Sequence, residues 1–122
     1  MNFNHVMIKT NNLDKAAGFY CDVMDMKIVV QKSIENTRLW FLSNSDNSLQ
    51  LELMETNENL NFNKPMHLGF SVKSMDEFSK KINNLGYKFS KEPFDITGHG
   101  SNVAFLYDND GYEIEVVEKV VW

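Results

Sequence analysis

The sequence contains a single cysteine and a single arginine among its 122 residues. Cys21 has no second cysteine with which to form an internal disulfide, as expected for a protein of the reducing cytoplasm. The chain carries 12 Lys plus Arg against 17 Asp plus Glu, which gives a formal net charge of -5. Proteins that bind the phosphate backbone show a basic face, so this composition excludes a nucleic-acid-binding function.

Long apolar runs are also absent. No stretch approaches the roughly 18 apolar residues that a membrane span requires, and the first residues lack the basic-then-apolar order of a secretory signal. Hydrophobic residues nevertheless make up 43% of the chain and aromatic residues 12%. That content is enough to build a core without disulfides in a chain of this length. We therefore expect one soluble, cytoplasmic domain over residues 1–122.

The second half of the chain repeats the pattern of the first. Residues 5–15 resemble residues 67–77 in the order of apolar, polar and charged side chains. Self-similarity at one fixed offset indicates a duplicated structural unit. We expect module one over about 1–56, a polar, Asn-rich linker over 57–65, and module two over about 66–122.

Apolar spacing predicts the order strand, helix, strand, strand, strand in each module. Asn12 or Asp14 can cap the first helix, and Gly86 is placed to end the second. The expected elements of module one are a helix at 14–24 and strands at 3–10, 27–33, 37–43 and 48–55. Those of module two are a helix at 75–85 and strands at 66–72, 87–90, 102–107 and 112–118. This order predicts an α+β fold of paired βαβββ modules.

One His and one Glu occupy matching positions in the two modules. His5 and Glu52 are 47 residues apart, and His67 and Glu115 are 48 residues apart. Side chains alternate between the faces of a strand, so each of these four lies opposite the bulky apolar residues of its strand. Imidazole and carboxylate together suit Zn²⁺, Ni²⁺, Co²⁺ or Fe²⁺. A shared metal site is one interpretation, and ordinary solvated strand faces are the other.

Several stretches carry a resemblance to a known family, and they follow one another along almost the whole chain. They are His5–Ile8, Phe19–Lys27, Leu51–Leu53, His67–Val72 and Asp108–Glu115. The last resembles the family's Asp-Pro-Asp-Gly turn before a Glu-bearing strand, with Asn109 in place of Pro. In this order the chain resembles the vicinal oxygen chelate superfamily, and within it the short bacterial glyoxalase I (lactoylglutathione lyase) type. The resemblance implies paired βαβββ modules that form an open, cup-shaped mixed sheet around a divalent metal.

The resemblance also implies a ligand set, a reaction and a partner. The metal ligands would be His5, Glu52, His67 and Glu115, with Glu115 as the catalytic base and Glu52 as its symmetry-related partner. The metal would be Ni²⁺ in the first place, with Zn²⁺ and Co²⁺ as alternatives. The reaction isomerises the hemithioacetal of methylglyoxal and a thiol to a 2-hydroxyacyl thioester through an enediolate, which detoxifies methylglyoxal. Short relatives are homodimers in which first-half ligands of one subunit meet second-half ligands of the other.

Recognition of the thiol is matched only in part. The family often has an Arg on the first strand, where this chain has Lys9, and an Asn near the position of Asn57. The expected substrate contacts are Lys9, Arg38 and Asn57. With one arginine in the chain, the carboxylates of glutathione would depend on Lys9, Arg38 or a lysine such as Lys91. Lysine offers a point charge without the bidentate fork of arginine, so the thiol stays open.

Other functions remain as alternatives. A coenzyme A-thioester epimerase of the same superfamily shares the enediolate chemistry but generally has Gln in the place of Glu52. An extradiol dioxygenase needs only two His and one Glu. A metal-free binding protein of the bleomycin-resistance type uses the same fold as a ligand cup. His99, in a Gly-rich loop, is either a lid residue or an exposed loop residue.

Overall fold

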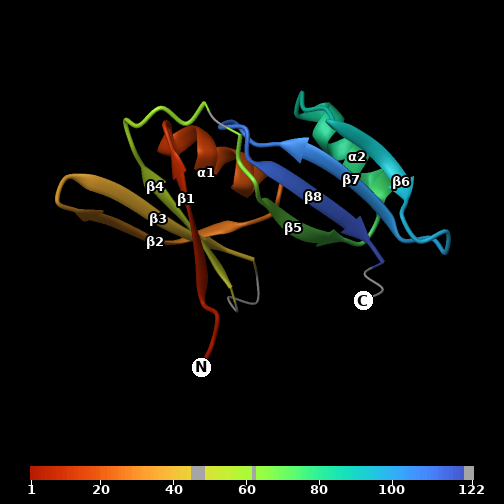
Figure 1. Ribbon diagram of the computed structural model, residues 1–122, viewed down its shortest axis with the longest axis horizontal. Helices are drawn as coiled ribbons and strands as arrows, with labels where there is room; N and C mark the ends of the chain where they lie inside the picture. Colours follow the sequence, from red (N-terminus) through yellow and green to blue (C-terminus); the bar gives the residue numbers. More distant parts are fainter. Residues whose placement is uncertain (45–48, 62, 120–122) are drawn as a thin grey trace. The chain divides into compact units, whose positions relative to one another are not determined.

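The computed structural model describes residues 1–44, 49–61 and 63–119 (Figure 1). The chain divides into two compact units, Met1–Phe62 and Asn63–Trp122. Each unit contains a strand, a helix and three further strands, in that order. The α+β architecture of paired βαβββ modules is therefore confirmed. No helix in the described part of the chain is long and apolar enough to cross a membrane.

The first unit is a four-stranded sheet with one helix. Its elements are β1 (His5–Thr10), α1 (Leu13–Asp22), β2 (Lys27–Ile34), β3 (Thr37–Ser43) and β4 (Gln50–Glu55). The strand order is β1-β4-β3-β2, with β1 parallel to β4 and the other neighbours antiparallel. Strand β4 was expected to begin at residue 48, which lies outside the described residues. Phe62 of the expected linker also lies outside them.

The second unit repeats this topology. Its elements are β5 (His67–Val72), α2 (Met75–Asn84), β6 (Lys91–Asp95), β7 (Asn102–Tyr107) and β8 (Glu113–Glu118). The strand order is β5-β8-β7-β6, and the outer strand β5 again runs parallel to its neighbour. In both units the parallel pair joins the first and the last strand, which brings residues far apart in the sequence side by side.

The expected strand at 87–90 is wrong, because the end of α2 uses this segment. Gly86 has a φ of 85°, and the Tyr87 N–H donates to the Ile82 carbonyl at 2.8 Å, which closes a Schellman motif. The strand begins only at Lys91 and pairs with β7 through a register shift before Phe94. Pro93 is tolerated there because β6 is an edge strand.

Both helices begin in the same way. Asn12 accepts a hydrogen bond from the Lys15 N–H at 3.0 Å, and Ser74 accepts one from the Glu77 N–H at 3.2 Å. These side chains satisfy donors that have no partner within the helix. Of the two caps considered for the first helix, Asn12 is therefore the one used.

The core of each unit lies on one face of its sheet. In the first unit the α1 residues Phe19 and Tyr20 are buried together with Leu53 of β4. In the second unit Ile82 of α2 and Ile114 of β8 are buried. Because side chains alternate along a strand, the residues next to Leu53 and Ile114 turn to the opposite face. Those neighbours are Glu52 and Glu115.

Candidate metal centre

The first unit places His5 and Glu52 together. They lie on the neighbouring parallel strands β1 and β4, where Met7 is the register partner of Glu52. His5 Nε2 lies 3.5 Å from Glu52 Oε1, with 46% of the His5 side chain and 11% of the Glu52 side chain exposed. Phe41, the register partner of Glu52 on β3, meets the imidazole edge-on at 5.9 Å between ring centroids. An accessible imidazole therefore stands over a largely buried carboxylate.

The second unit repeats this arrangement with His67 and Glu115. His67 Nε2 lies 3.5 Å from Glu115 Oε2, with the same 46% of the His67 side chain exposed and 20% of the Glu115 side chain. Phe105, the register partner of Glu115 on β7, meets the imidazole edge-on at 6.1 Å. The duplication thus extends from the fold to a half-site of three side chains.

The separation within each pair suits two ligands of one ion. At 3.5 Å, the Nε2 and carboxylate oxygen are too far apart for a good hydrogen bond. Metal–nitrogen and metal–oxygen bonds of about 2.1 Å place two ligand atoms roughly 3.0–3.4 Å apart at octahedral or tetrahedral angles. A small adjustment of side chains would close that gap. The nitrogen and oxygen donors present therefore fit a divalent transition metal.

Neither unit holds three ligands by itself. Among the described residues, no group of three or more His, Cys, Asp and Glu side chains is placed to hold a metal ion. The structure thus brings the four expected ligands together as two pairs, one in each unit.

Two further side chains contact the outer ring nitrogens. Glu113 Oε1 lies 3.5 Å from Nδ1 of His67, and the register of β5 and β8 makes these two residues direct neighbours. In the first unit the Asn4 side-chain oxygen contacts Nδ1 of His5. Neither residue was predicted from the sequence. The signal available for Glu113 was its place two residues before Glu115, which puts both carboxylates on one face of β8.

Arg38 lies on the other face of its sheet. Its guanidinium donates to both carboxylate oxygens of Glu55, at 3.1 and 2.8 Å, and approaches Asp14 of α1 at 3.7 Å. The hydrogen bonds to Glu55 raise the pKa of Arg38, and they hold the pKa of Glu55 below its usual range. The structure therefore does not bring Arg38 to the His5–Glu52 pair.

Lys9 shares the face of His5 but already has an anionic partner. Its ammonium lies 2.6 Å from Glu58 Oε2, and this hydrogen bond lowers the pKa of Glu58. Asn57 is exposed directly after Thr56, which follows the end of β4. Of the three residues expected to hold glutathione, two are thus engaged with carboxylates of the chain itself.

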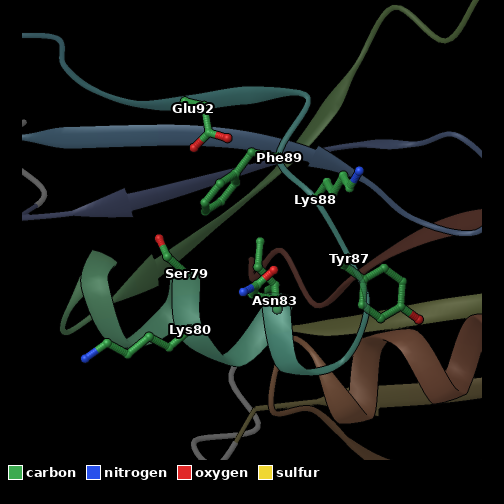
Figure 2. A pocket seen from close by; sticks show the side chains of 8 residues that line it. Ser79, Lys80, Asn83, Tyr87, Lys88, Phe89 and Glu92 are labelled. Atoms are coloured by element: carbon green, nitrogen blue, oxygen red, sulfur yellow. The ribbon is translucent and has the colours of Figure 1, made fainter.

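Other features of the second unit lie apart from the His67–Glu115 pair. His99 is exposed in a loop that the Asp95 carboxylate organises by accepting the N–H groups of Thr97, Gly98 and Gly100. The hydrogen bonds to this loop, the one from Gly100 foremost, lower the pKa of Asp95. A hollow of about 380 Å³ lies between α2 and residues 87–92 (Figure 2). None of the expected site residues lines this hollow.

The sequence matches the family described as the Glyoxalase/Bleomycin resistance protein/Dioxygenase superfamily over residues 2–116. The chain therefore belongs to this superfamily, the class that its duplicated βαβββ modules also indicate.

The chain is similar to several named proteins over most of its length. The chain is 30% identical to a probable lactoylglutathione lyase from Synechocystis, over 93% of this chain and 92% of the relative. It is also 30% identical to a lactoylglutathione lyase from Neisseria meningitidis, over 98% and 91%. Among solved structures, the fosfomycin resistance protein FosX from Listeria monocytogenes superposes with a TM-score of 0.81 at 19% identity, over 99% of this chain and 95% of that one. A FosX variant was crystallised with Mn(II). These relatives support an enzyme of the superfamily, and FosX shows the shared fold.

Proposed function

We propose that the chain is a glyoxalase I-like lyase that isomerises the hemithioacetal of methylglyoxal and a thiol to a 2-hydroxyacyl thioester. The observation that carries the proposal is the duplicated His–Glu pair, with the same 3.5 Å separation at matching positions of the two sheets. A single pair could be an ordinary surface contact. Two equivalent pairs that lack a hydrogen bond, each with a largely buried carboxylate, are better explained as ligands. Relatives named lactoylglutathione lyase at 30% identity support the same reaction.

The metal centre that we propose takes His5 and Glu52 from one module and His67 and Glu115 from the other. The two modules would come from the two subunits of a homodimer, as the family resemblance implies. Ni²⁺ is our first choice of metal, with Zn²⁺ and Co²⁺ as alternatives. When bound, the ion would supply Lewis-acid stabilisation of the charge that develops on two adjacent substrate oxygens.

Glu115 moves the proton in this proposal. The hemithioacetal carbon that bears the hydroxyl group loses a proton to the carboxylate, and an enediolate forms. Glu115 then returns the proton to the neighbouring carbon, and the hydroxyl proton passes from the first oxygen to the second. The first carbon is thereby oxidised to a thioester and the neighbouring carbonyl carbon is reduced to an alcohol, with no external oxidant or reductant. A carboxylate held beside the reacting carbon can act as both base and acid. Glu52 occupies the equivalent position on the other module.

The thiol need not be glutathione. Arg38 lies on the opposite face, and the Lys9 ammonium lies 2.6 Å from Glu58. The two cations expected to bind the carboxylates of glutathione are therefore both paired with carboxylates of the chain itself. We expect the enzyme to accept hemithioacetals of thiols that carry less negative charge.

The test is turnover of methylglyoxal hemithioacetals by protein loaded with Ni²⁺ or Zn²⁺. Glutathione, coenzyme A and the uncharged 2-mercaptoethanol would be compared as thiols, and thioester formation followed by absorbance. We expect metal-dependent turnover that a His67→Ala variant loses and a Glu92→Gln variant, changed on the exposed surface of β6, retains. Metal binding without turnover of any hemithioacetal would contradict the lyase proposal and favour the epimerase. Protein that takes up no metal would favour the metal-free binding protein.

A further inference from the structure

The two histidines of the proposed centre have different partners at their outer ring nitrogens. Nδ1 of His67 faces the carboxylate of Glu113 at 3.5 Å, whereas Nδ1 of His5 contacts the amide oxygen of Asn4. In the first module the register position that matches Glu113 is held by Gln50, the partner of His5. The two modules therefore share the same His–Glu pair at Nε2 but differ in the residue that contacts Nδ1.

At both outer positions an acceptor oxygen faces Nδ1, and a hydrogen bond there would favour the same form of the imidazole. An amide oxygen and an ionised carboxylate accept hydrogen bonds but donate none, so each favours a proton on Nδ1. The neutral ring then presents its lone pair on Nε2, the atom that faces Glu52 or Glu115. A metal-binding histidine characteristically donates its other N–H to a carboxylate or carbonyl in this way. The acceptor that would keep the lone pair on Nε2 is thus a carboxylate in the second module and an amide oxygen in the first.

The geometry points to Glu113 as a positioning residue for His67, a role that rests on the proposed metal centre. At 3.5 Å this contact is long for a hydrogen bond, and a small movement of either side chain would close it. The carboxylate would then fix the tautomer and the ring plane of His67 and make Nε2 a better electron-pair donor to the metal than Nε2 of His5, whose partner is a neutral amide. Glu113 would therefore strengthen the second module's share of the metal centre without contacting the ion itself, because it faces the ring nitrogen on the far side from Glu115.

If Glu113 had a merely structural role, its substitution would lower the stability of the metal-free protein. The positioning role predicts no such loss. The Glu113 side chain is 38% exposed and that of His67 46% exposed, and an exposed polar contact of this kind contributes little to folding stability. Substitution of Glu113 should accordingly leave the unfolding of the metal-free protein unchanged. Any loss should appear only in metal affinity and in the state of the His67 ring.

The experiment is a Zn²⁺ titration of the full chain by competition with a chromogenic chelator. Removing a partner of a metal-binding histidine costs about 10–100-fold in affinity, and we expect a loss of that size in Glu113→Ala. Glu113→Gln, which keeps an accepting oxygen without the charge, should fall between Glu113→Ala and the wild type. Glu92→Gln is the control, because it removes one exposed carboxylate of the same unit. It should bind Zn²⁺ with the affinity of the wild type.

Nitrogen-15 spectra of the histidines in the Zn²⁺-loaded protein show which ring nitrogen carries the proton. This result does not depend on folding stability. We expect His67 to carry its proton on Nδ1, with a resolved proton signal that Glu113→Ala loses to solvent exchange. If the wild type binds Zn²⁺ and Glu113→Ala binds it equally well, or if the His67 proton lies on Nε2, the role of Glu113 is overturned and the metal centre stands. If the wild type binds no metal ion, the proposed function and this inference are both overturned.

Discussion

At the scale of single residues, the two carboxylates of the half-sites differ in accessibility. The side chain of Glu52 is 11% exposed and that of Glu115 is 20% exposed. Both carboxylates are thus accessible enough to reach a ligand while being held by their strands. Glu115 is the proposed base, as the family resemblance implies, and Glu52 is its symmetry-related partner.

Replacing Glu115 with Gln tests this assignment. The amide keeps the size of the side chain and an oxygen donor, so we expect the variant to fold and to retain most of its metal. It cannot accept the proton, and loss of a general base typically costs about 10²–10⁴-fold in rate. Stopped-flow or steady-state turnover, beside metal analysis of the same sample, measures both quantities. Near-full turnover by the variant would show that another group is the base.

At the scale of elements, a carboxylate at the end of the last strand holds the start of the helix in each module. Glu118 of β8 accepts the Met75 N–H at 2.7 Å and the Asn102 amide at 3.1 Å. Glu55 of β4 accepts the Leu13 N–H at 3.4 Å together with the two bonds from Arg38. A negative charge at a helix N-terminus also interacts favourably with the helix dipole. These contacts tie each helix to its sheet.

This capping contact predicts how stability depends on pH. The hydrogen bond from Met75 foremost lowers the pKa of Glu118 from its ordinary value of 4.5. A lowered carboxylate pKa contributes stability that is complete above 4.5 and is lost as the pH falls through the folded-state value. Glu118→Gln should therefore be less stable than the wild type at neutral pH, and the difference should shrink below pH 4.5. Urea unfolding across this range, with Glu92→Gln as control, measures the difference; a gap that stays constant with pH would contradict it.

The elements that could be predicted from the sequence are those whose buried residues recur at the spacing of a helix or a strand. The duplicated order, the helix stop at Gly86 and the opposite faces of Leu53 and Glu52 all follow from local periodicity. The strand after α2 was misplaced because Tyr87 still belongs to the helix-ending motif, and because the residue at which β6 begins to pair depends on its register with β7, which apolar spacing does not encode. Arg38 was expected near substrate because arginine is scarce, yet its partner Glu55 depends on the register of β3 with β4. Register also explains why Glu113 was missed.

At the scale of the whole molecule, duplication explains why the chain carries two incomplete sites. Each unit supplies one imidazole and one carboxylate on the open face of its sheet, and no described cluster reaches three ligands. The proposed centre therefore takes one His–Glu pair from a first module and one from a second module. The proposed activity is in this sense a property of the paired modules rather than of either one alone.

Metal stoichiometry tests this account most directly. We would load tag-free protein with Ni²⁺, remove free metal, and determine metal per chain by plasma mass spectrometry for the wild type, His5→Ala and His67→Ala. Because the proposed ion needs ligands from both modules, we expect about one Ni²⁺ per chain in the wild type and little in either variant. Full metal content in either variant, or none in the wild type, would contradict a centre built from both His–Glu pairs.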